Sequence, residues 1–274
     1  MTAPSSRRVA SGAVLIVFGL MGFGGMAIKA APGAAAGVDW RPVPGTTWQW
    51  QLSGPVDTSI DAQVYDIDLF DTPQETIDAL HLAGRRVVCY FSAGSHEVRR
   101  PDSDSFPRRT LGESLDPPYA SERWLDVRNP AVRPIMQARL DIARDKHCDG
   151  VEPDNLDGYE HKTGFKLKAG HQRSYNRFIA DQAHARGLAV GLKNNAKQAT
   201  ALEPRFDFAV VEQCFEFEEC RKYTPFIDAG KAVFAAEYES DPAEFCPAAA
   251  QLRFSAILKR LDVGVPRVAC PTGG

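Results

Sequence analysis

The most informative segment of the chain is Asp149-Gly150-Val151-Glu152-Pro153-Asp154-Asn155-Leu156-Asp157-Gly158-Tyr159. A short strand ends there in a cluster of carboxylates, and period-two alternation puts Glu152 and Asp154 on one face of the strand. In a barrel of parallel strands, catalytic groups project from the carboxyl ends of the strands. The stretch therefore predicts such a strand with a catalytic site at its end. The alternatives are a polar turn or a calcium loop, although the ligand pattern of an EF-hand is missing.

Short β-rich runs and helical patterns alternate on both sides of this stretch, which is typical of a parallel sheet wrapped by helices. We expect eight strands, at residues 47–51, 63–67, 86–91, 150–153, 189–192, 208–212, 232–236 and 266–269. Helical patterns occupy residues 72–84, a segment from Pro130, and residues 171–187 and 242–261. Residues 99–123 lack periodicity and predict a long loop over one rim. The pattern predicts an α/β fold, a single (β/α)8 barrel of the TIM type.

The first 36 residues have the pattern of a secretory signal peptide followed by a short linker. Arg7 and Arg8 precede an apolar run at residues 13–28, and small residues follow at 30–36. We expect cleavage, with residues 37–274 as one secreted barrel domain. Because the apolar run is close to the length that spans a membrane, an uncleaved anchor is the alternative.

The charge balance bears on the kind of partner. Three of the 32 Lys and Arg residues and none of the 35 acids lie in residues 1–36, so the remaining chain carries a net charge of −6. A mildly acidic domain argues against nucleic acid as a partner. Nothing in the sequence suggests more than a monomer.

Six cysteines in an exported chain predict disulfides, for which fifteen pairings exist. Cys214 and Cys220 are close enough in sequence to close one loop, and we expect this pair first. The other expected pairs are Cys89 with Cys148 and Cys246 with Cys270. The spacings lack the paired Cys-x2-Cys pattern of a zinc site. We therefore expect neither a metal nor a cofactor.

A second acid, Glu212, ends the apolar run of residues 208–211. Desolvation there should raise its pKa and suit it to general acid catalysis, whereas the simpler alternative is an ion-paired glutamate at a strand end. Other expected strand ends bring further polar groups to the same rim, namely Asp66, Asp68, Tyr90, Ser92, Lys193 and Glu237. Trp48 and Trp50 could stack against sugar rings, although a strand tryptophan is more often part of the core.

These segments together resemble the endo-α-1,4-polygalactosaminidase family, glycoside hydrolase family 114. The resemblance runs from about Trp40 to Cys270, and the Asp-Gly-Val-Glu-Pro-Asp-Asn-x-Asp-Gly-Tyr string at residues 149–159 is its most specific part. Other matching pieces are residues 48–54, 64–68, 88–94, 191–194 and 212–215. The resemblance implies a (β/α)8 barrel acting on a galactosamine-containing polymer, with Asp154 and Glu212 as the catalytic pair. It places Asp66, Tyr90, Lys193 and Tyr159 along the sugar site.

The resulting prediction is a secreted, endo-acting glycosidase that cleaves α-1,4 linkages with two carboxylates. Asp154 would be the nucleophile and Glu212 the acid and base, which gives retention if the carboxyls lie roughly 5–5.5 Å apart and not the roughly 6.5–9.5 Å of inverting enzymes. Asn155 would contact the substrate. Further acids would hold the ammonium groups of a cationic substrate: Asp66, Asp68, Glu152, Asp157 and Glu237. Two alternatives remain open, a non-catalytic polysaccharide-binding barrel and a hydrolase of another amino-sugar polymer.

Overall fold

The computed structural model describes residues 38–271. The predicted signal peptide and its linker lie outside the described residues, so they stay predictions. Within residues 38–271, no helix is both long and apolar enough to cross a membrane.

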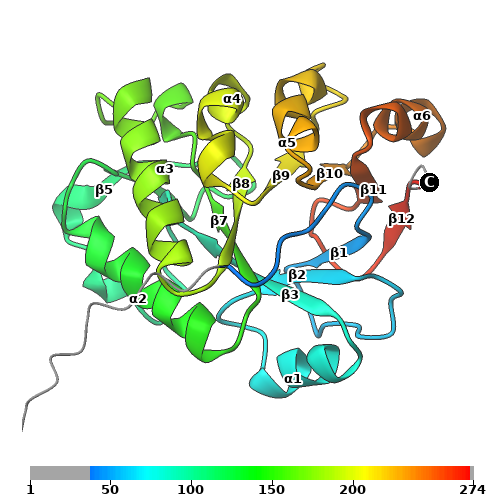
Figure 1. Ribbon diagram of the computed structural model, residues 1–274. Coiled ribbons are helices and arrows are strands. Elements are labelled where there is room, and N and C mark those ends of the chain that lie inside the picture. Colours follow the sequence, from blue (N-terminus) through cyan, green and yellow to red (C-terminus); the bar gives the residue numbers. More distant parts are fainter. Residues whose placement is uncertain (1–37, 272–274) are drawn as a thin grey trace, which may run out of the picture. The chain divides into compact units, whose positions relative to one another are not determined.

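Parallel strands form a barrel, as predicted (Figure 1). Eight strands pair in parallel in the order β1-β2-β3-β7-β8-β9-β10-β11, and a ninth, β12, pairs antiparallel with β11. The bounds of the nine strands are β1 Trp48–Gln51, β2 Val64–Asp68, β3 Arg86–Ser92, β7 Gly150–Asp154, β8 Ala189–Lys193, β9 Phe208–Glu212, β10 Val233–Glu237, β11 Ser255–Lys259 and β12 Arg267–Ala269. All eight parallel strands therefore end at one rim of the barrel, where the polar strand ends meet.

Helices surround the strands in Figure 1. Their bounds are α1 Gln74–Leu82, α2 Val132–Asp145, α3 Ala169–His184, α4 Ala199–Leu202, α5 Thr224–Asp228 and α6 Pro242–Leu252. Helix α2 shows why they pack there, since its apolar residues at helical spacing, Ile135, Met136 and Leu140 among them, are buried. Burying one apolar stripe of each helix against the sheet is the usual solution for this fold class.

One predicted helix is wrong in its second half. The pattern at residues 242–261 predicts a single helix, but α6 ends at Leu252 and Arg253 takes a left-handed backbone conformation with φ of 57°. Ser255–Lys259 is instead β11, the eighth parallel strand. Its only apolar residues, Ala256, Ile257 and Leu258, form a run too short to distinguish helical from extended periodicity, which explains the error. The predicted strand at residues 266–269 does form, as the antiparallel β12.

The barrel is closed between β1 and the C-terminal segment mostly by side chains. The indole Nε1 of Trp48 donates to the carbonyl oxygen of Ser255 at 2.8 Å, and Nε2 of Gln49 donates to the carbonyl oxygen of Val265 at 2.9 Å. The guanidinium of Arg267 donates to the carbonyl oxygen of Trp48. The barrel is therefore closed by contacts between its first strand, β1, and the segment from Ser255 to Arg267.

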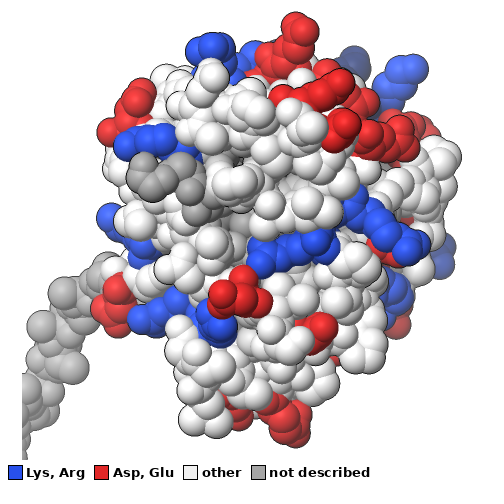
Figure 2. All heavy atoms as spheres, turned by 90° about the vertical axis from the view of Figure 1, so that its right-hand side faces the viewer, with Lys and Arg blue, Asp and Glu red and all other residues white. Residues whose placement is uncertain are grey.

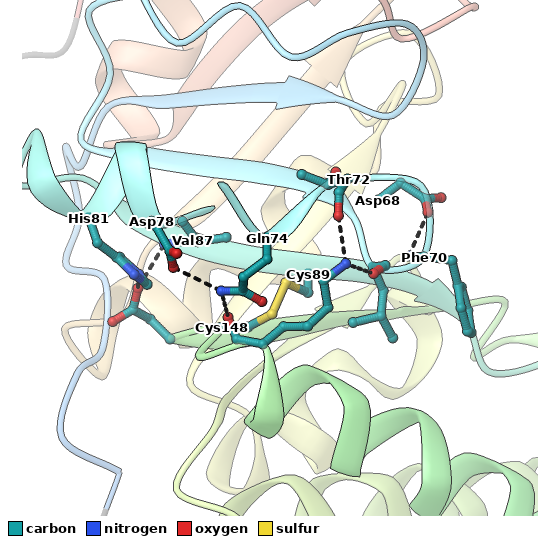
Figure 3. Close-up of a disulfide and its surroundings, with 12 residues drawn as sticks. Asp68, Phe70, Thr72, Gln74, Asp78, His81, Val87, Cys89 and Cys148 are labelled. Atoms are coloured by element: carbon teal, nitrogen blue, oxygen red, sulfur yellow. Dashed lines mark hydrogen bonds and ion pairs between the residues drawn. A yellow bond between two sulfur atoms is a disulfide. The ribbon is translucent and has the colours of Figure 1, made fainter. Parts of the chain in front are cut away.

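All three expected disulfides are present and account for every cysteine. Cys89–Cys148 joins β3 to the residues before β7 and is surrounded by polar contacts (Figure 3). In that surrounding, Nε2 of Gln74 donates to Oδ1 of Asp78 at 2.9 Å and to the carbonyl oxygen of Lys146 at 3.1 Å. Cys214–Cys220 closes the loop that follows β9, and Cys246–Cys270 ties α6 to the residue after β12.

The long loop expected at residues 99–123 is partly ordered into a small sheet. Strands β4 (Ser95–His96), β5 (Leu111–Ser114) and β6 (Arg123–Leu125) pair antiparallel in the order β4-β6-β5. Strands of two to four residues are too short to show periodicity in a sequence. This excursion between β3 and α2 forms one side of the rim where the barrel strands end.

Candidate active site

A cavity of about 820 Å³ opens at the carboxyl ends of the barrel strands. Its wall includes residues at or near the ends of four strands: Tyr90 of β3, Asp154 of β7, Lys193 of β8 and Glu212 of β9. The structure thus brings together the side chains that the sequence places at separate strand ends.

Lys193 lies at the centre of the site, fully buried among three carboxylates. Its Nζ is 3.0 Å from Oε1 of Glu152, 3.2 Å from Oδ1 of Asp154 and 3.2 Å from Oε2 of Glu212. Burial alone lowers the pKa of Lys193, but the charges of Asp154, Glu152 and Glu212 outweigh it and hold the pKa well above its usual range. The Nζ also lies 4.8 Å from the centre of the Trp50 ring, a cation–π distance. Lys193 is therefore an ammonium that fixes the positions of both predicted catalytic carboxylates.

Asp154 is held from two further directions. The hydroxyl of Tyr90 donates to Oδ2 at 3.1 Å, and the backbone N–H of Asn155 donates to Oδ1 at 2.7 Å. The side chain keeps 18% of its surface exposed to the cavity. A carboxylate with hydrogen-bond donors on both oxygens and an open face has the requirements of a nucleophile.

Glu212 accepts hydrogen bonds on both of its oxygens. Nδ2 of Asn194 donates to Oε2 at 3.1 Å, while the hydroxyl of Tyr238 donates to Oε1. Burial raises the pKa of Glu212, but Lys193, Tyr238 and Asn194 more than offset this and leave the pKa below its usual range. The expectation of a raised pKa is therefore wrong. The groups that stabilise the ionised carboxylate are distant from Glu212 in the sequence, so its local pattern does not reveal them.

The floor of the site is a pair of buried acids. Burial and the charge of Glu152 raise the pKa of Asp66 well above its usual range, and within residues 38–271 no N–H or hydroxyl donates to either oxygen of its carboxyl. A protonated Asp66 donates a hydrogen bond to Glu152, whose own pKa burial raises to about 7. Nε1 of Trp50 donates to Oε2 of Glu152 at 3.0 Å. This pair lies beneath Lys193 and does not line the cavity.

The remaining predicted residues divide into those in the cavity wall and those behind it. Asn155, Asp157 and Asp68 line the wall. Asp68 is nonetheless almost fully buried, with Oδ2 2.6 Å from Nη2 of Arg100. Asp157 has Oδ2 3.3 Å from Nε2 of His161 and is more accessible.

Four predicted contacts lie behind the wall. Trp48 stacks on Trp50 in the barrel interior with ring centres 5.8 Å apart, which is the core role weighed for it above. Ser92 is fully buried, and Glu237 accepts the backbone N–H of Phe215 at 2.9 Å. The hydroxyl of Tyr159 donates to Oδ1 of Asn195 at 3.3 Å. These side chains support the wall from outside it.

Many residues of the wall were not predicted from the sequence, among them Tyr119, Glu122 and Phe217. Tyr119 and Glu122 come from the excursion between β3 and α2, and Phe217 comes from the disulfide-closed loop after β9. Tyr238, next to the predicted strand-end residue Glu237, also lines the wall. Tyr119 and Phe217 are exposed large side chains, at 44% and 60%. The only signal in the sequence was the position of the excursion over one rim, which points to a region but to no single residue.

The family model described as glycoside-hydrolase family GH114 matches residues 29–273. The chain belongs to this family. The resemblance inferred from the sequence is thereby confirmed, and with it the assignment of this GH114 protein as a glycoside hydrolase.

Solved structures agree with the family and the fold. Aspergillus fumigatus Ega3, solved in complex with galactosamine, is 40% identical, with a TM-score of 0.81 over 87% of this chain and 100% of that one. The glycoside hydrolase domain of PelA from Pseudomonas aeruginosa is 14% identical, with a TM-score of 0.60 over 81% of this chain and 97% of that one. An α-galactosidase from Thermus thermophilus is also 14% identical, with a TM-score of 0.50 over 82% and 64%. The last two support the fold alone. No curated protein matches the sequence.

Proposed function

We propose that this GH114 protein cleaves α-1,4 linkages within galactosamine-containing polysaccharide, with Asp154 as nucleophile and Glu212 as general acid and base. One observation carries the proposal: a single buried ammonium, Nζ of Lys193, lies 3.2 Å from an oxygen of each carboxylate. Both carboxylates also face the same cavity. The choice of sugar is supported by the relative at 40% identity, which was solved with galactosamine.

The spacing of the two carboxylates is compatible with retention. Because Oδ1 of Asp154 and Oε2 of Glu212 are each 3.2 Å from one nitrogen, these two oxygens lie no further apart than the two distances placed end to end. The roughly 5–5.5 Å separation of carboxyls in retaining enzymes fits within that limit. In a retaining reaction Asp154 attacks the anomeric carbon, and Glu212 gives its proton to the leaving oxygen. Glu212 then takes a proton from the water that releases the sugar.

The pKa of Glu212 sets the pH at which this works. The acid step needs a protonated Glu212, and Lys193 and Tyr238 keep its pKa below the usual range. The fraction of enzyme ready for the first step therefore grows as the pH falls, and we expect hydrolysis to be faster in mild acid than at neutral pH. Once Asp154 carries the sugar and is neutral, Lys193 holds Glu212 ionised, as the second step requires.

A cationic polymer fits the acids that face the cavity. Asp116 and Asp157 line the wall, whereas Asp66 and Glu152 lie under the floor, and Asp68 and Glu237 have their own buried partners. Acidic and basic side chains are interspersed over the outer face in Figure 2, so we attribute substrate attraction to the cavity and not to that face. Affinity should then weaken as salt screens the ammonium groups.

The function is tested by release of reducing ends from α-1,4-galactosamine polymer by protein with residues 1–36 removed. We expect activity in the wild type and a loss of several orders of magnitude in both Asp154→Asn and Glu212→Gln. Binding without cleavage in the wild type would favour a polysaccharide-binding barrel, and cleavage of a different polymer alone would change the sugar. Export, cleavage of residues 1–36 and a monomeric state belong to the same proposal; intact-mass measurement of the protein recovered from culture medium tests the first two.

A further inference from the structure

A chain of short contacts leads from the rim of the cavity to the backbone beside Asp154. Oε2 of Glu122 is 2.5 Å from Oγ of Ser95, which is 2.7 Å from Oγ of Ser92. Oγ of Ser92 is in turn 2.7 Å from Oδ1 of Asn155. The N–H of Asn155 donates to Oδ1 of Asp154 at 2.7 Å. Glu122 is thus connected to the predicted nucleophile through three side chains.

The chain needs one hydrogen in each of its oxygen–oxygen contacts. Three oxygen–oxygen contacts join Glu122, Ser95, Ser92 and Asn155, and each requires one hydrogen. The two serine hydroxyls supply one hydrogen each, while the carbonyl oxygen of the Asn155 side chain supplies none. The third hydrogen is therefore a proton on the carboxyl of Glu122.

The turn that carries the two serines is fixed on every side. Nη1 of Arg139 donates to the carbonyl oxygen of Ser92 at 2.6 Å, and the hydroxyl of Tyr175 donates to that of Ala93 at 2.7 Å. Gly94 approaches Asn155 so closely that a Cβ on it would lie 1.8 Å from the carbonyl oxygen of Asn155. A change at one end of the chain therefore reaches Asn155 and is not absorbed by the turn.

We propose that Glu122 is a positioning residue, whose protonated carboxyl completes the hydrogen-bond chain that holds the Asp154 carboxylate in place. This inference rests on the proposed function, since it takes Asp154 as the nucleophile. Asn155 has a left-handed backbone with φ of 60°, which its side-chain contact with Ser92 helps to hold. Loss of the chain leaves the N–H of Asn155, and with it Asp154, less well oriented for attack.

The surroundings of Glu122 favour the protonated form of its carboxyl. Its carboxyl is faced by Glu97 and Arg100 from the segment after β4, by Asp154 from β7, and by the phenols of Tyr90 and Tyr119. Burial, followed by the charges of Glu97 and Asp154, raises the pKa of Glu122 to about 7, although the charge of Arg100 and the hydrogen bond that Ser95 can donate to the ionised carboxylate act in the opposite direction. Below that pH the chain is complete. Above it one contact has no hydrogen.

The first test is the pH profile of kcat on galactosamine polymer. Loss of the Glu212 proton lowers kcat steadily as the pH rises from mild acid, and in the wild type we expect an additional, steeper fall as the pH passes through about 7. Glu122→Gln donates an N–H to Ser95 at every pH, so the additional fall should be absent from that variant. Glu122→Ala and Ser95→Ala both break the chain, and each should lower kcat at pH 6 about tenfold, with a smaller change in KM. Glu113→Gln, the same chemical change on β5 at an exposed position outside the cavity wall, should match the wild type.

Two results would overturn the inference. An alkaline fall with the same midpoint in the wild type and Glu122→Gln would assign it to Glu152, whose pKa is also about 7. An unchanged kcat in both Glu122→Ala and Ser95→Ala would show that the chain positions nothing. A readout without substrate separates this failure from failure of the proposed function. The side-chain amide of Asn155, followed by NMR, should titrate with Glu122 in the wild type and not in Glu122→Gln, even if the wild type cleaves no galactosamine polymer.

Discussion

The charged groups of Lys193 and Glu152 are 3.0 Å apart, and both residues are almost completely buried inside the barrel. Such a pair has a large desolvation cost, so it is weak evidence for stability by itself. In this site the pair positions the carboxylates of Asp154 and Glu212. Glu152 holds the ammonium from below, which leaves the remaining directions of Lys193 for Asp154 and Glu212.

Removing the ammonium should therefore damage both activity and stability. Lys193→Met leaves the three carboxylates close together without a cation, and we expect kcat to fall at least a hundredfold. The free energy of unfolding should drop by about 3–5 kcal/mol, as for other broken buried pairs. Steady-state kinetics and urea denaturation measure the two effects. Lys162→Met, at an exposed position outside the cavity wall, is the matched control. Activity of Lys193→Met close to that of the wild type would contradict the central role of this ammonium.

Asp66 predicts a stability that declines with rising pH. In the unfolded chain an Asp ionises near pH ~4, whereas in the fold burial and Glu152 keep the pKa of Asp66 well above that. Its contribution is complete below pH ~4 and is lost as the pH rises through the folded pKa. Asp66→Asn copies the neutral form, so at pH 8 it should exceed the wild type by about 1 kcal/mol or more, with no advantage at pH 4. Thermal denaturation of both proteins at pH 4 and pH 8 tests this difference. Asp104→Asn, the same change at an exposed position, is the control and should match the wild type at both pH values.

The three disulfides should differ in their contribution to stability. Chain entropy predicts about 4 kcal/mol for Cys89–Cys148, with a sequence separation of 59, and about 2 kcal/mol for Cys214–Cys220, with a sequence separation of 6. Paired Cys→Ser variants compared by denaturant unfolding test this order. A smaller loss for the Cys89–Cys148 variant than for the Cys214–Cys220 variant would contradict it.

Gly94 should tolerate no side chain. Because a Cβ there would lie 1.8 Å from the carbonyl oxygen of Asn155, Gly94→Ala must displace the backbone beside Asp154. We expect a loss of activity of a hundredfold or so together with a lower melting temperature. Gly170→Ala is the control, because that glycine lies in α3 with open space around it. This helix substitution should stabilise the protein by up to about 1 kcal/mol. An active Gly94→Ala variant would show that the turn has room to move.

The sequence predicts the barrel well because strand ends carry their own signal. Seven of the eight expected strands lie within a residue or two of β1, β2, β3, β7, β8, β9 and β10. An apolar run that ends at a polar residue identifies a strand and its end from neighbouring residues alone. The parallel topology then brings these strand ends to one rim. The helix predicted through β11 was wrong because the short apolar run Ala256–Leu258 after a helix gives no local signal that the helix ends.

The site was less predictable where the environment of a side chain decides its behaviour. Glu212 follows an apolar strand, and its pKa is nevertheless lowered, because Lys193, Tyr238 and Asn194 reach it from other strand ends. Asp68 is a strand-end acid like Asp154, yet Arg100 holds it in a buried ion pair. Glu122 lies in an excursion without periodicity. Such partners are set by tertiary packing, which a single sequence does not display.

The side-chain contacts that close the barrel also order the events of folding. Strand β1 is complete by residue 51, but its partners at Ser255, Val265 and Arg267 come more than 200 residues later. Until those residues are in place, the incomplete barrel has two unpaired strand edges, and unpaired edges can pair with other chains. Cys246–Cys270 becomes able to form only after this seam segment has emerged. Oxidation of that pair would then report that the C-terminal segment has reached the barrel.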